Sequence, residues 1–268
     1  MRAALSRVDA PTATTKYGAL YVSRDDPFVA RFLLERGVWE PGETALLEER
    51  LRPGMTFVDV GAHVGYFTLL ASKLVGTRGR VVALEPHPRN FRLLRANIRR
   101  NDLANVVAVE AAAGDVTGAV DLYEAPHNTG DHRVFASHDE PREATSVRTT
   151  RVDDLGLSPP VDVVKIDVQG AEQAVVRGME RLLAASPGVF LSVEFWPYGI
   201  VRFGGEPRDV LAYYRSLGFE LLVQQPEEPG LLPWEDDQIL AHCRGKDGWD
   251  FVTLALSRRF ETVVASRT

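Results

Sequence analysis

The chain has 268 residues, of which 45% are hydrophobic and 25% charged, and a formal net charge of -6 at pH 7. This composition is typical of a globular protein, and the negative charge argues against a broad surface for nucleic acid. Its one cysteine, Cys243, cannot form an internal disulfide, and no apolar run approaches the ~18 residues of a membrane span. We expect a cytoplasmic protein that binds neither nucleic acid nor membrane, with the oligomeric state, a homodimer included, left open.

The first 54 residues precede the first strand that we expect in the core. Residues 1–16 show no periodicity and are expected to be frayed, residues 17–23 alternate as a short strand, and helices are expected over 27–37 and 41–51. A segment placed ahead of a core sheet can lie over a cofactor. We therefore interpret residues 1–54 as an N-terminal helical lid, with plain packing as the alternative.

Residues 55–75 carry the pattern on which the functional interpretation depends. An apolar run contains Asp59 near its end, two glycines follow at Gly61 and Gly65, and an apolar helix begins there. This order predicts a buried strand, a tight turn and a buried helix. Glycine at these positions allows a sharp turn and lets a ligand approach the backbone.

The next predicted strand, residues 80–85, ends in Glu85, where an acid can accept both ribose hydroxyls of a nucleoside. The turn reads D-x-G-x-x-x-G, which has one glycine fewer than the dinucleotide pattern and an acid, Asp59, beside it. That acid would repel a pyrophosphate but suits a cationic ligand such as S-adenosylmethionine. A nicotinamide-dependent oxidoreductase and a βαβ unit without a ligand are the alternatives.

The alternation then continues with a helix over 88–100 and a strand over 106–111, which predicts a parallel sheet with right-handed crossovers. Ala113 and Asp115 follow this third strand, where the adenine is commonly held in S-adenosylmethionine folds. We assign both residues to the cofactor site. An acid that merely follows the turn at Gly114 is the alternative for Asp115.

Residues 118–150 interrupt the alternation with three short predicted strands, 119–123, 133–136 and 146–150. We expect a β-hairpin insertion between the third and fourth core strands. Its tip is dense in polar groups, which favours a role in the site over a bland polar loop. The side chains concerned are His127, Asn128, Thr129, Asp131, His132 and Arg133.

Four more strands are predicted, and they complete an α/β sheet: 161–166, 189–193, 219–223 and 251–256. Asp167 and Glu194 follow the fourth and fifth strands, so they share a sheet edge with Glu85. A helix is expected over 206–217 and a loop over 225–237. We see no second domain boundary and predict one domain over 1–268, with its core in 55–257.

Residues 57–196 resemble the FkbM-type family of S-adenosylmethionine-dependent methyltransferases. The resemblance rests on Asp59–Thr68, Glu85–Pro86, Asn128–Gly130, Lys165–Glu172 and Glu194. It implies a class I methyltransferase, Rossmann-like sheet of seven strands, six parallel and one antiparallel, with S-adenosyl-L-methionine as cofactor. It also implies O-methylation of a hydroxyl on a natural product or sugar. We assign these residues to the cofactor: Asp59, Gly61, His63, Gly65, Tyr66, Thr68, Glu85, Pro86, Ala113, Asp115 and Asn128.

Two positions depart from the family pattern, His63 where Asn is usual and Gln169 where Glu is usual. His63 lies in the cofactor turn, where much of the contact is made by the backbone, so we expect cofactor binding to persist. Gln169 removes a negative charge beside Asp167. That change weakens an acidic pair acting there as a base or as a metal site.

A hydroxyl nucleophile must lose its proton, and a base within reach typically accelerates this step by about 10²–10⁴-fold. His132 is the leading candidate because its ordinary pKa lies near working pH, and His127, Asp167 and Glu194 are its rivals. A metal-assisted version with Asp131, His132, Asp167 and Glu194 as Mg²⁺ ligands is one alternative, and a non-catalytic module that only binds the cofactor is another.

The expected partner is a small hydroxylated acceptor, which the sequence does not name. Several aromatic side chains in the lid and after the fifth strand are candidates for an apolar or sugar-stacking pocket, with a place in the core as the alternative. They are Tyr17, Tyr21, Trp39, Trp196, Tyr198 and Phe203.

Overall fold

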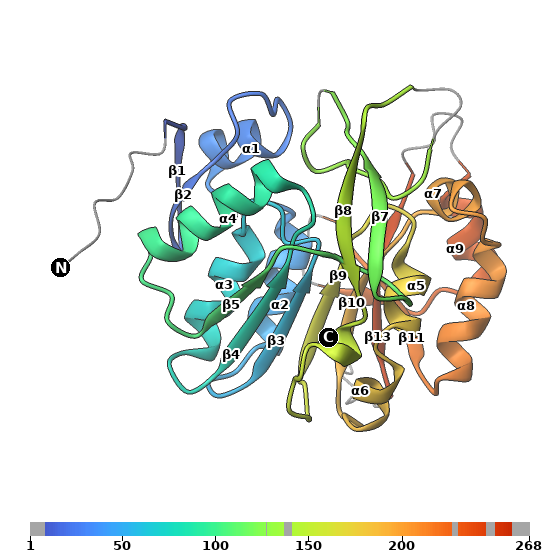
Figure 1. Ribbon diagram of the computed structural model, residues 1–268. Coiled ribbons are helices and arrows are strands. Elements are labelled where there is room, and N and C mark those ends of the chain that lie inside the picture. The colour runs from blue at the N-terminus through green and yellow to red at the C-terminus, as the bar shows by residue number, and fades with distance from the viewer. Residues whose placement is uncertain (1–8, 127, 137–140, 227–229, 245–249, 259–268) are drawn as a thin grey trace.

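The computed structural model describes residues 9–126, 128–136, 141–226, 230–244 and 250–258. Within these ranges, eight strands form one sheet in the order β12-β11-β13-β10-β9-β3-β4-β5 (Figure 1). The strands are β3 (Thr56–Val60), β4 (Arg80–Leu84), β5 (Val106–Val109), β9 (Val163–Ile166), β10 (Phe190–Phe195), β11 (Glu220–Gln224), β12 (Leu231–Leu232) and β13 (Val252–Ser257).

Strands β3, β4, β5, β9 and β10 pair in parallel, which confirms the predicted α/β architecture. Strand β13 lies antiparallel between β10 and β11, so β11 runs in the same direction as β10. Six strands therefore share one direction and β13 opposes them, as expected. The seven-strand prediction omitted β12, a two-residue strand that pairs antiparallel with β11 at the sheet edge.

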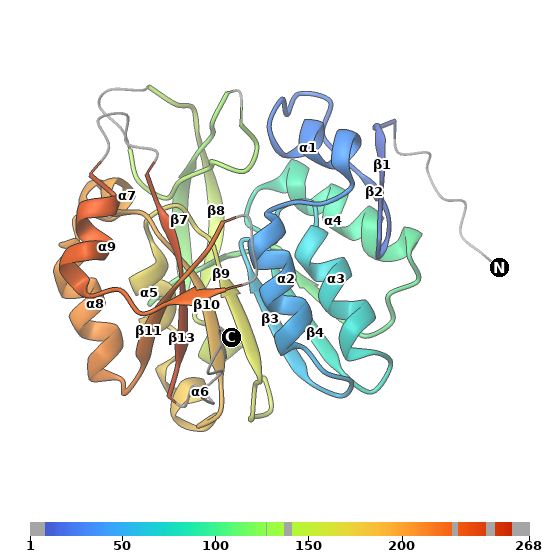
Figure 2. The same ribbon diagram turned by 180° about the vertical axis from the view of Figure 1, so that it is seen from behind.

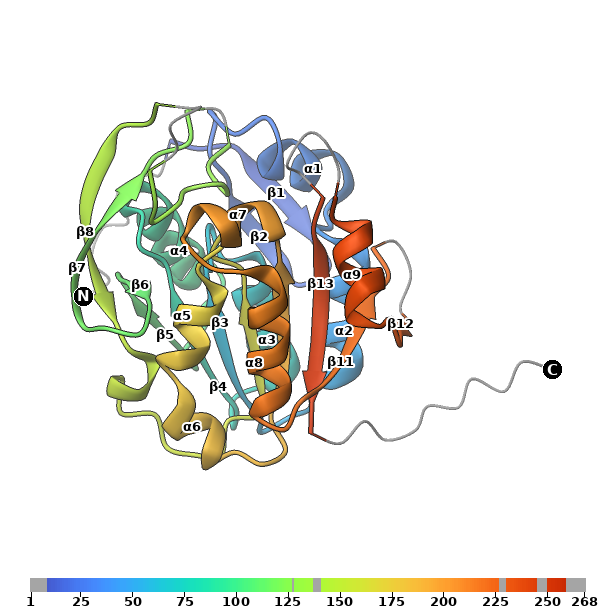
Figure 3. The ribbon, with the colours of Figure 1, turned by 90° about the vertical axis from the view of Figure 1, so that its right-hand side faces the viewer.

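Alternate positions along the strands face two helical layers, because successive side chains of a strand point to opposite faces. Val58 and Val164 pack with the layer of α5 (Glu172–Arg177), α6 (Glu180–Ala184) and α8 (Pro207–Ser216). Phe57 and Val163 pack with the layer of α2 (Pro41–Arg50) and α3 (Tyr66–Val75). Figure 2 shows α2 and α3 in front of β3 and β4, and Figure 3 shows α5 and α8 on the other face.

The N-terminal segment contains a hairpin that the sequence only half predicted. Strand β1 (Thr12–Thr15) pairs antiparallel with β2 (Gly18–Tyr21), so the expectation that residues 1–16 are frayed is wrong for 12–15. The hairpin is held by α4 (Pro88–Arg100), whose Asn97 side chain accepts from the Tyr21 amide and donates to the Tyr21 carbonyl. The predicted helices are present as α1 (Val29–Arg36) and α2.

The predicted insertion is present as β7 (Gly118–Tyr123) paired antiparallel with β8 (Ala144–Thr150), and β6 (Ala112–Ala113) joins β8 in parallel. The strand predicted over 133–136 is absent from the described structure. Only Arg133 makes an isolated bridge, to Tyr123. Arg133 is buried in an ion pair with Asp131, which fixes the segment as an irregular loop. The described part of this loop lies at the same end of the molecule as α1 (Figure 1).

The chain after β10 contains two short helices that we did not predict, α7 (Pro197–Arg202) and α9 (Asp236–His242). Pro197 occupies the first turn of α7, a position that proline favours. Helix α9 begins with a capping box, in which Glu235 and Gln238 each accept from the other's backbone amide. Both signals are readable in the sequence. In the described part of the chain, no helix is long and apolar enough to cross a membrane.

Candidate functional site

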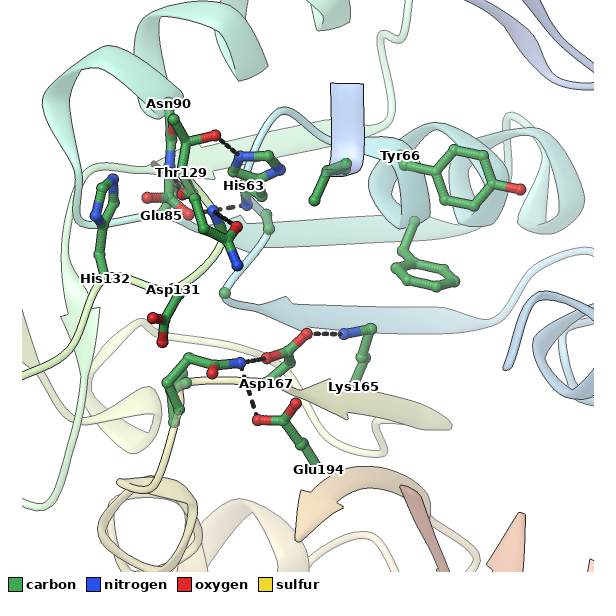
Figure 4. A pocket seen from close by; sticks show the side chains of 18 of the residues that line it. His63, Tyr66, Glu85, Asn90, Thr129, Asp131, His132, Lys165, Asp167 and Glu194 are labelled. Atoms are coloured by element: carbon green, nitrogen blue, oxygen red, sulfur yellow. Dashed lines mark hydrogen bonds and ion pairs between the residues drawn. The ribbon is translucent and has the colours of Figure 1, made fainter. Parts of the chain in front are cut away.

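A cavity of about 730 Å³ lies at the carboxyl ends of β3, β4, β9 and β10, the edge at which ligands bind in doubly wound sheets (Figure 4). The N-terminal segment contributes Phe28, Phe32 and Trp39 to its wall, and the insertion contributes Asn128 to His132. The cavity thus brings together the predicted lid, the glycine turn and the insertion.

Gly61 places the cofactor turn directly against the end of β9. Its φ is +84°, and a Cβ built there would lie 1.9 Å from the carbonyl oxygen of Asp167. No side chain fits at this distance, so Gly61 is required by both backbone angle and space. Gly65 has a φ of +93° and leaves room for Leu94 in the same way.

Glu85 is held by the backbone of the turn and of its own strand end. Its Oε2 accepts from the His63 amide at 2.8 Å, and its Oε1 accepts from the His87 amide at 2.9 Å. Burial raises the pKa of Glu85 to about 7, partly offset by these two bonds. Each carboxylate oxygen keeps a second acceptor site, so both remain able to accept ribose hydroxyls.

Asp59 lies behind the cavity wall, outside the residues that line it. Its Oδ2 accepts from the Thr68 hydroxyl at 2.5 Å, and its Oδ1 is buried without a hydrogen-bond partner among the described residues. Burial raises the pKa of Asp59 to about 6, while the nearby Lys165 ammonium opposes the rise. By accepting from Thr68, the Asp59 side chain connects the end of β3 to helix α3 behind the cavity wall.

A buried lysine connects β9 to the N-terminal segment. Lys165 Nζ lies 2.9 Å from Asp167 Oδ2 and 3.7 Å from Glu43 Oε2, and Glu43 Oε1 accepts from the Ser192 hydroxyl at 2.5 Å. Burial alone would lower the pKa of Lys165, but the carboxylates of Asp167, Glu43 and Glu40 raise it well above its ordinary value. The lysine is therefore a permanent cation that holds one oxygen of Asp167.

Gln169 bridges the two candidate catalytic acids. Its Nε2 donates to Asp167 Oδ1 and to Glu194 Oε2, both at 2.9 Å, from a backbone φ of +58°. Burial, together with the charge of Asp167, raises the pKa of Glu194 well above its ordinary value. Where Glu is usual in the family pattern, Gln169 thus supplies an amide group that donates to both neighbouring acids (Figure 4).

His132 lines the cavity but its geometry disfavours the base role. Its Nδ1 accepts from the Ala125 amide at 3.0 Å, which occupies the lone pair that a neutral ring would use to take a proton. Burial, with the His87 ring centroid 4.0 Å away, lowers the pKa of His132 to about 3. The rival base His127 lies outside the described residues.

Asp131 belongs to an ion-pair network with two arginines and is not free to bind a metal. Arg133 binds it through two hydrogen bonds of 2.8 Å, and Arg142 Nη2 donates to it at 2.7 Å. Among the described residues, no group of three or more His, Cys, Asp or Glu side chains is arranged to hold a metal ion. The proposed Mg²⁺ ligand set of Asp131, His132, Asp167 and Glu194 is thus not assembled.

The structure brings most predicted site residues to the cavity wall and leaves four outside it. Asp59, Gly65 and Thr68 support the turn from behind, and Asp115 is turned away, with its carbonyl accepting from Arg151. Of the aromatic candidates, only Trp39 and Trp196 line the cavity. The predicted residues on the wall are Gly61, His63, Tyr66, Glu85, Pro86, Ala113, Asn128, His132, Asp167 and Glu194.

Glu40 and Asn90 line the cavity but were not predicted as site residues from the sequence. Glu40, in the lid, has a φ of +43° and a buried Oε2 without a hydrogen-bond partner in the described structure. Its position directly before Pro41 signals a helix start but not a site. Asn90 donates to the Thr129 carbonyl at 2.8 Å, and the Thr129 hydroxyl contacts His63. The unpartnered carboxylate oxygen of Glu40 fits a cationic cofactor, which S-adenosylmethionine is.

Two curated proteins are similar to parts of this chain. Hexuronic acid methyltransferase AglP of Haloferax volcanii is 28% identical over 169 residues, which cover 62% of this chain and 63% of that protein. A probable cobalt-precorrin-6B C(15)-methyltransferase (decarboxylating) of Sulfolobus acidocaldarius is 36% identical over 76 residues, covering 28% of this chain and 40% of that protein. The matches therefore span less than two thirds of the length of either relative.

Among solved structures, the crystal structure of methyltransferase FkbM from Methylobacillus flagellatus KT has a TM-score of 0.48 at 16% identity and covers 84% of this chain and 52% of that chain. The methyltransferase FkbM domain matches residues 59–221, more than half of the chain. This match includes the glycine turn, Glu85, the insertion, Asp167 and Glu194. The cofactor is S-adenosylmethionine, and the chain belongs to the methyltransferase FkbM domain family.

Proposed function

We propose that this protein transfers the methyl group of S-adenosylmethionine to a hydroxyl of a small acceptor, with Asp167 as the base. The observation that carries the proposal is the position of Asp167: its carboxylate lies in the same cavity as Glu85, and its carbonyl lies against the cofactor turn at Gly61. A methyl donor held by the turn would therefore meet an acceptor held beside a carboxylate.

In the proposed site, Glu85 accepts the ribose hydroxyls, and Pro86, Ala113 and Asn128 form the wall around the adenine. The acids Glu40 and Asp167 face the cationic end of the cofactor. When bound, the cofactor supplies an electrophilic methyl group on a sulfonium. The contribution of the chain is to hold the acceptor oxygen in line with that methyl group and to exclude water.

Deprotonation of the hydroxyl is assigned to Asp167. Lys165 and Gln169 each donate to one of its oxygens and so fix its orientation. Glu194 lines the same cavity, held by the Gln169 amide, and can form a hydrogen bond to a second oxygen of the acceptor. His132, with its Nδ1 occupied by an amide, would donate from Nε2 rather than accept.

The proposed acceptor is a hydroxylated small molecule, with a sugar as the first choice. Trp39 and Trp196 offer aromatic faces in the cavity wall, a surface on which sugar rings stack. The similarity to a relative named hexuronic acid methyltransferase supports the same choice. The negative charge of the chain disfavours a nucleic acid. We further propose that residues 1–54 act as a lid within a single domain.

The experiment combines binding with transfer. Calorimetry should show one S-adenosylhomocysteine per chain, and Glu85→Ala should weaken that binding by at least about tenfold, the loss of two charge-assisted bonds. Radioactive methyl from S-adenosylmethionine, offered with a panel of methyl glycosides, hexuronides and phenols, should appear as a methyl ether. Absence of S-adenosylhomocysteine binding would contradict the cofactor site, and label on nitrogen or carbon would contradict O-methylation.

A further inference from the structure

Thr129, at the tip of the insertion, contacts three separate parts of the chain. Its hydroxyl lies 2.8 Å from His63 Nε2 in the cofactor turn and donates to Asp26 Oδ2 at 2.7 Å. Its carbonyl accepts from the Asn90 side chain of α4 at 2.8 Å. Figure 4 shows Thr129 between His63 and Asn90 at the cavity wall.

The direction of these hydrogen bonds is fixed by their chemistry. The Thr129 hydroxyl has one proton, and it goes to the Asp26 carboxylate, so His63 must donate through Nε2–H. Burial lowers the pKa of His63, which favours the neutral ring, and the hydrogen bond to Thr129 then requires the tautomer that carries its proton on Nε2. His63 in the turn therefore donates to Thr129, and Thr129 donates to Asp26 in the lid.

Asp26 links Thr129 to the start of helix α1. Its Oδ1 accepts from the amides of Phe28 and Val29 at 2.9 and 3.0 Å, so one carboxylate both caps the helix and receives Thr129. Asp26 is 3% exposed. Phe28 and Val29 line the cavity, and the same Asp26 fixes the backbone from which both side chains extend.

His63 also links Thr129 to Glu85, the acid proposed to bind the ribose, because the His63 amide donates to the Glu85 carboxylate. We propose that Thr129 is a positioning residue for the cofactor: its hydroxyl holds helix α1 of the lid against the turn whose His63 amide donates to Glu85. The inference rests on the proposed cofactor site. Thr129 acts through His63 and Asp26 and needs no contact with the reacting atoms.

The test uses the isosteric change Thr129→Val, with Thr129→Ser as the conservative rescue. Valine keeps the volume and removes the hydroxyl, which leaves a buried carboxylate and a ring donor without their partner. We expect the Kd for S-adenosylhomocysteine to rise about tenfold, the equivalent of roughly one to two hydrogen bonds. Serine should restore the Kd to within about twofold of the wild type.

Two further measurements separate positioning from simple stability. The ligand-free melting temperature of Thr129→Val should fall below that of Thr129→Ser, because two buried groups lose their partner, and the Kd is compared at a temperature at which both variants are folded. S-adenosylhomocysteine should protect Arg31 and Arg36 of α1 from trypsin in the wild type and the serine variant but not in the valine variant. Thr117→Val is the matched control, because its hydroxyl donates to Asp154, outside the cavity wall; its Kd should not change.

Several results would overturn the proposal. An unchanged Kd in Thr129→Val would do so, and so would an equal loss in Thr129→Ser, because the hydroxyl would then not be the cause. Thr129→Ala serves the same comparison if valine prevents folding. In the double variant Thr129→Val with His63→Phe, the rise in the Kd for S-adenosylhomocysteine should not exceed the larger of the two single-variant rises by more than about twofold. Single-variant effects that multiply in the double variant would show that the two residues act independently and would contradict the proposal. Failure of the wild type to bind would instead contradict the proposed function.

Discussion

The two halves of the cavity are built by different means. Around Glu85, the contacts come from the backbone amides of His63 and His87, and glycine leaves the space. Around Asp167, they come from side chains, and the network extends from Lys165 and Gln169 to Glu43 of the lid and Glu194 of β10. The proposed donor half is therefore fixed by main-chain geometry, whereas the proposed acceptor half depends on which side chains happen to be present.

This difference predicts how each half responds to substitution. A side chain in the acceptor half can be exchanged without moving the backbone, so its loss should affect chemistry more than cofactor binding. A change in the turn should affect folding and cofactor binding together. The three predictions below separate the halves, in order of decreasing effect.

The largest effect is expected from Asp167→Asn. The variant keeps the size of the side chain and loses the base, so methyl transfer at saturating substrate should fall by about 10²–10⁴-fold. S-adenosylhomocysteine affinity, measured by calorimetry, should stay within a few fold. His132→Asn, whose amide oxygen can still accept from Ala125, should lose less than about tenfold. Full turnover in Asp167→Asn together with inactivity in His132→Asn would reverse the assignment of the base.

Gly61→Ala should be the more damaging change for folding. A Cβ at this position would lie 1.9 Å from the Asp167 carbonyl oxygen at a φ of +84°, so the backbone must move. We expect a loss of about 3 kcal/mol in the free energy of unfolding, measured with urea. Gly54→Ala is the matched control, because its φ is +91° but nothing lies within 4 Å of the added carbon. It should cost only about 1 kcal/mol, and equal losses would show that the close approach at Gly61 is not decisive.

The smallest effect is a pH dependence of cofactor binding. Burial raises the pKa of Glu85 to about 7 in the free protein, and ribose hydroxyls prefer the ionised carboxylate. Binding below pH 7 must therefore release a proton, so the affinity for S-adenosylhomocysteine should rise with pH by up to about tenfold from pH 6 to 8. Glu85→Gln should bind more weakly with a flatter profile. An affinity that falls over this range would contradict the role of Glu85.

The donor half was also the half that could be predicted from the sequence. Gly61, Gly65 and Glu85 follow strands at fixed short spacings, so their side of the cavity is encoded locally. Residues 133–136 have the composition of a strand but form a loop, in which Asp131 pairs with the buried Arg133 and with Arg142, contacts that periodicity does not report. Thr129, Asp26 and His63 are far apart in the chain, and only the fold reveals that they meet.

His132 shows the same limit for chemistry. An ordinary histidine pKa suggested a base, but burial, which no local pattern encodes, lowers the pKa of His132 to about 3, and its Nδ1 accepts from the Ala125 amide. Gln169 was noticed only as a missing acid. Its side chain donates one hydrogen bond to Asp167, at the end of β9, and one to Glu194, in β10. These two strands are not adjacent in sequence.

The contact between Gly61 and the Asp167 carbonyl has a consequence for how such a cavity diversifies. Because the two strand ends approach each other through main-chain atoms, the position of the Asp167 backbone relative to the cofactor turn does not depend on neighbouring side chains. Substitutions along β10, the lid or the insertion can then alter which acceptor is admitted while the alignment for transfer is inherited unchanged. Proteins built in this way can change the acceptor that they bind through mutations in β10, the lid or the insertion and still catalyse the same reaction.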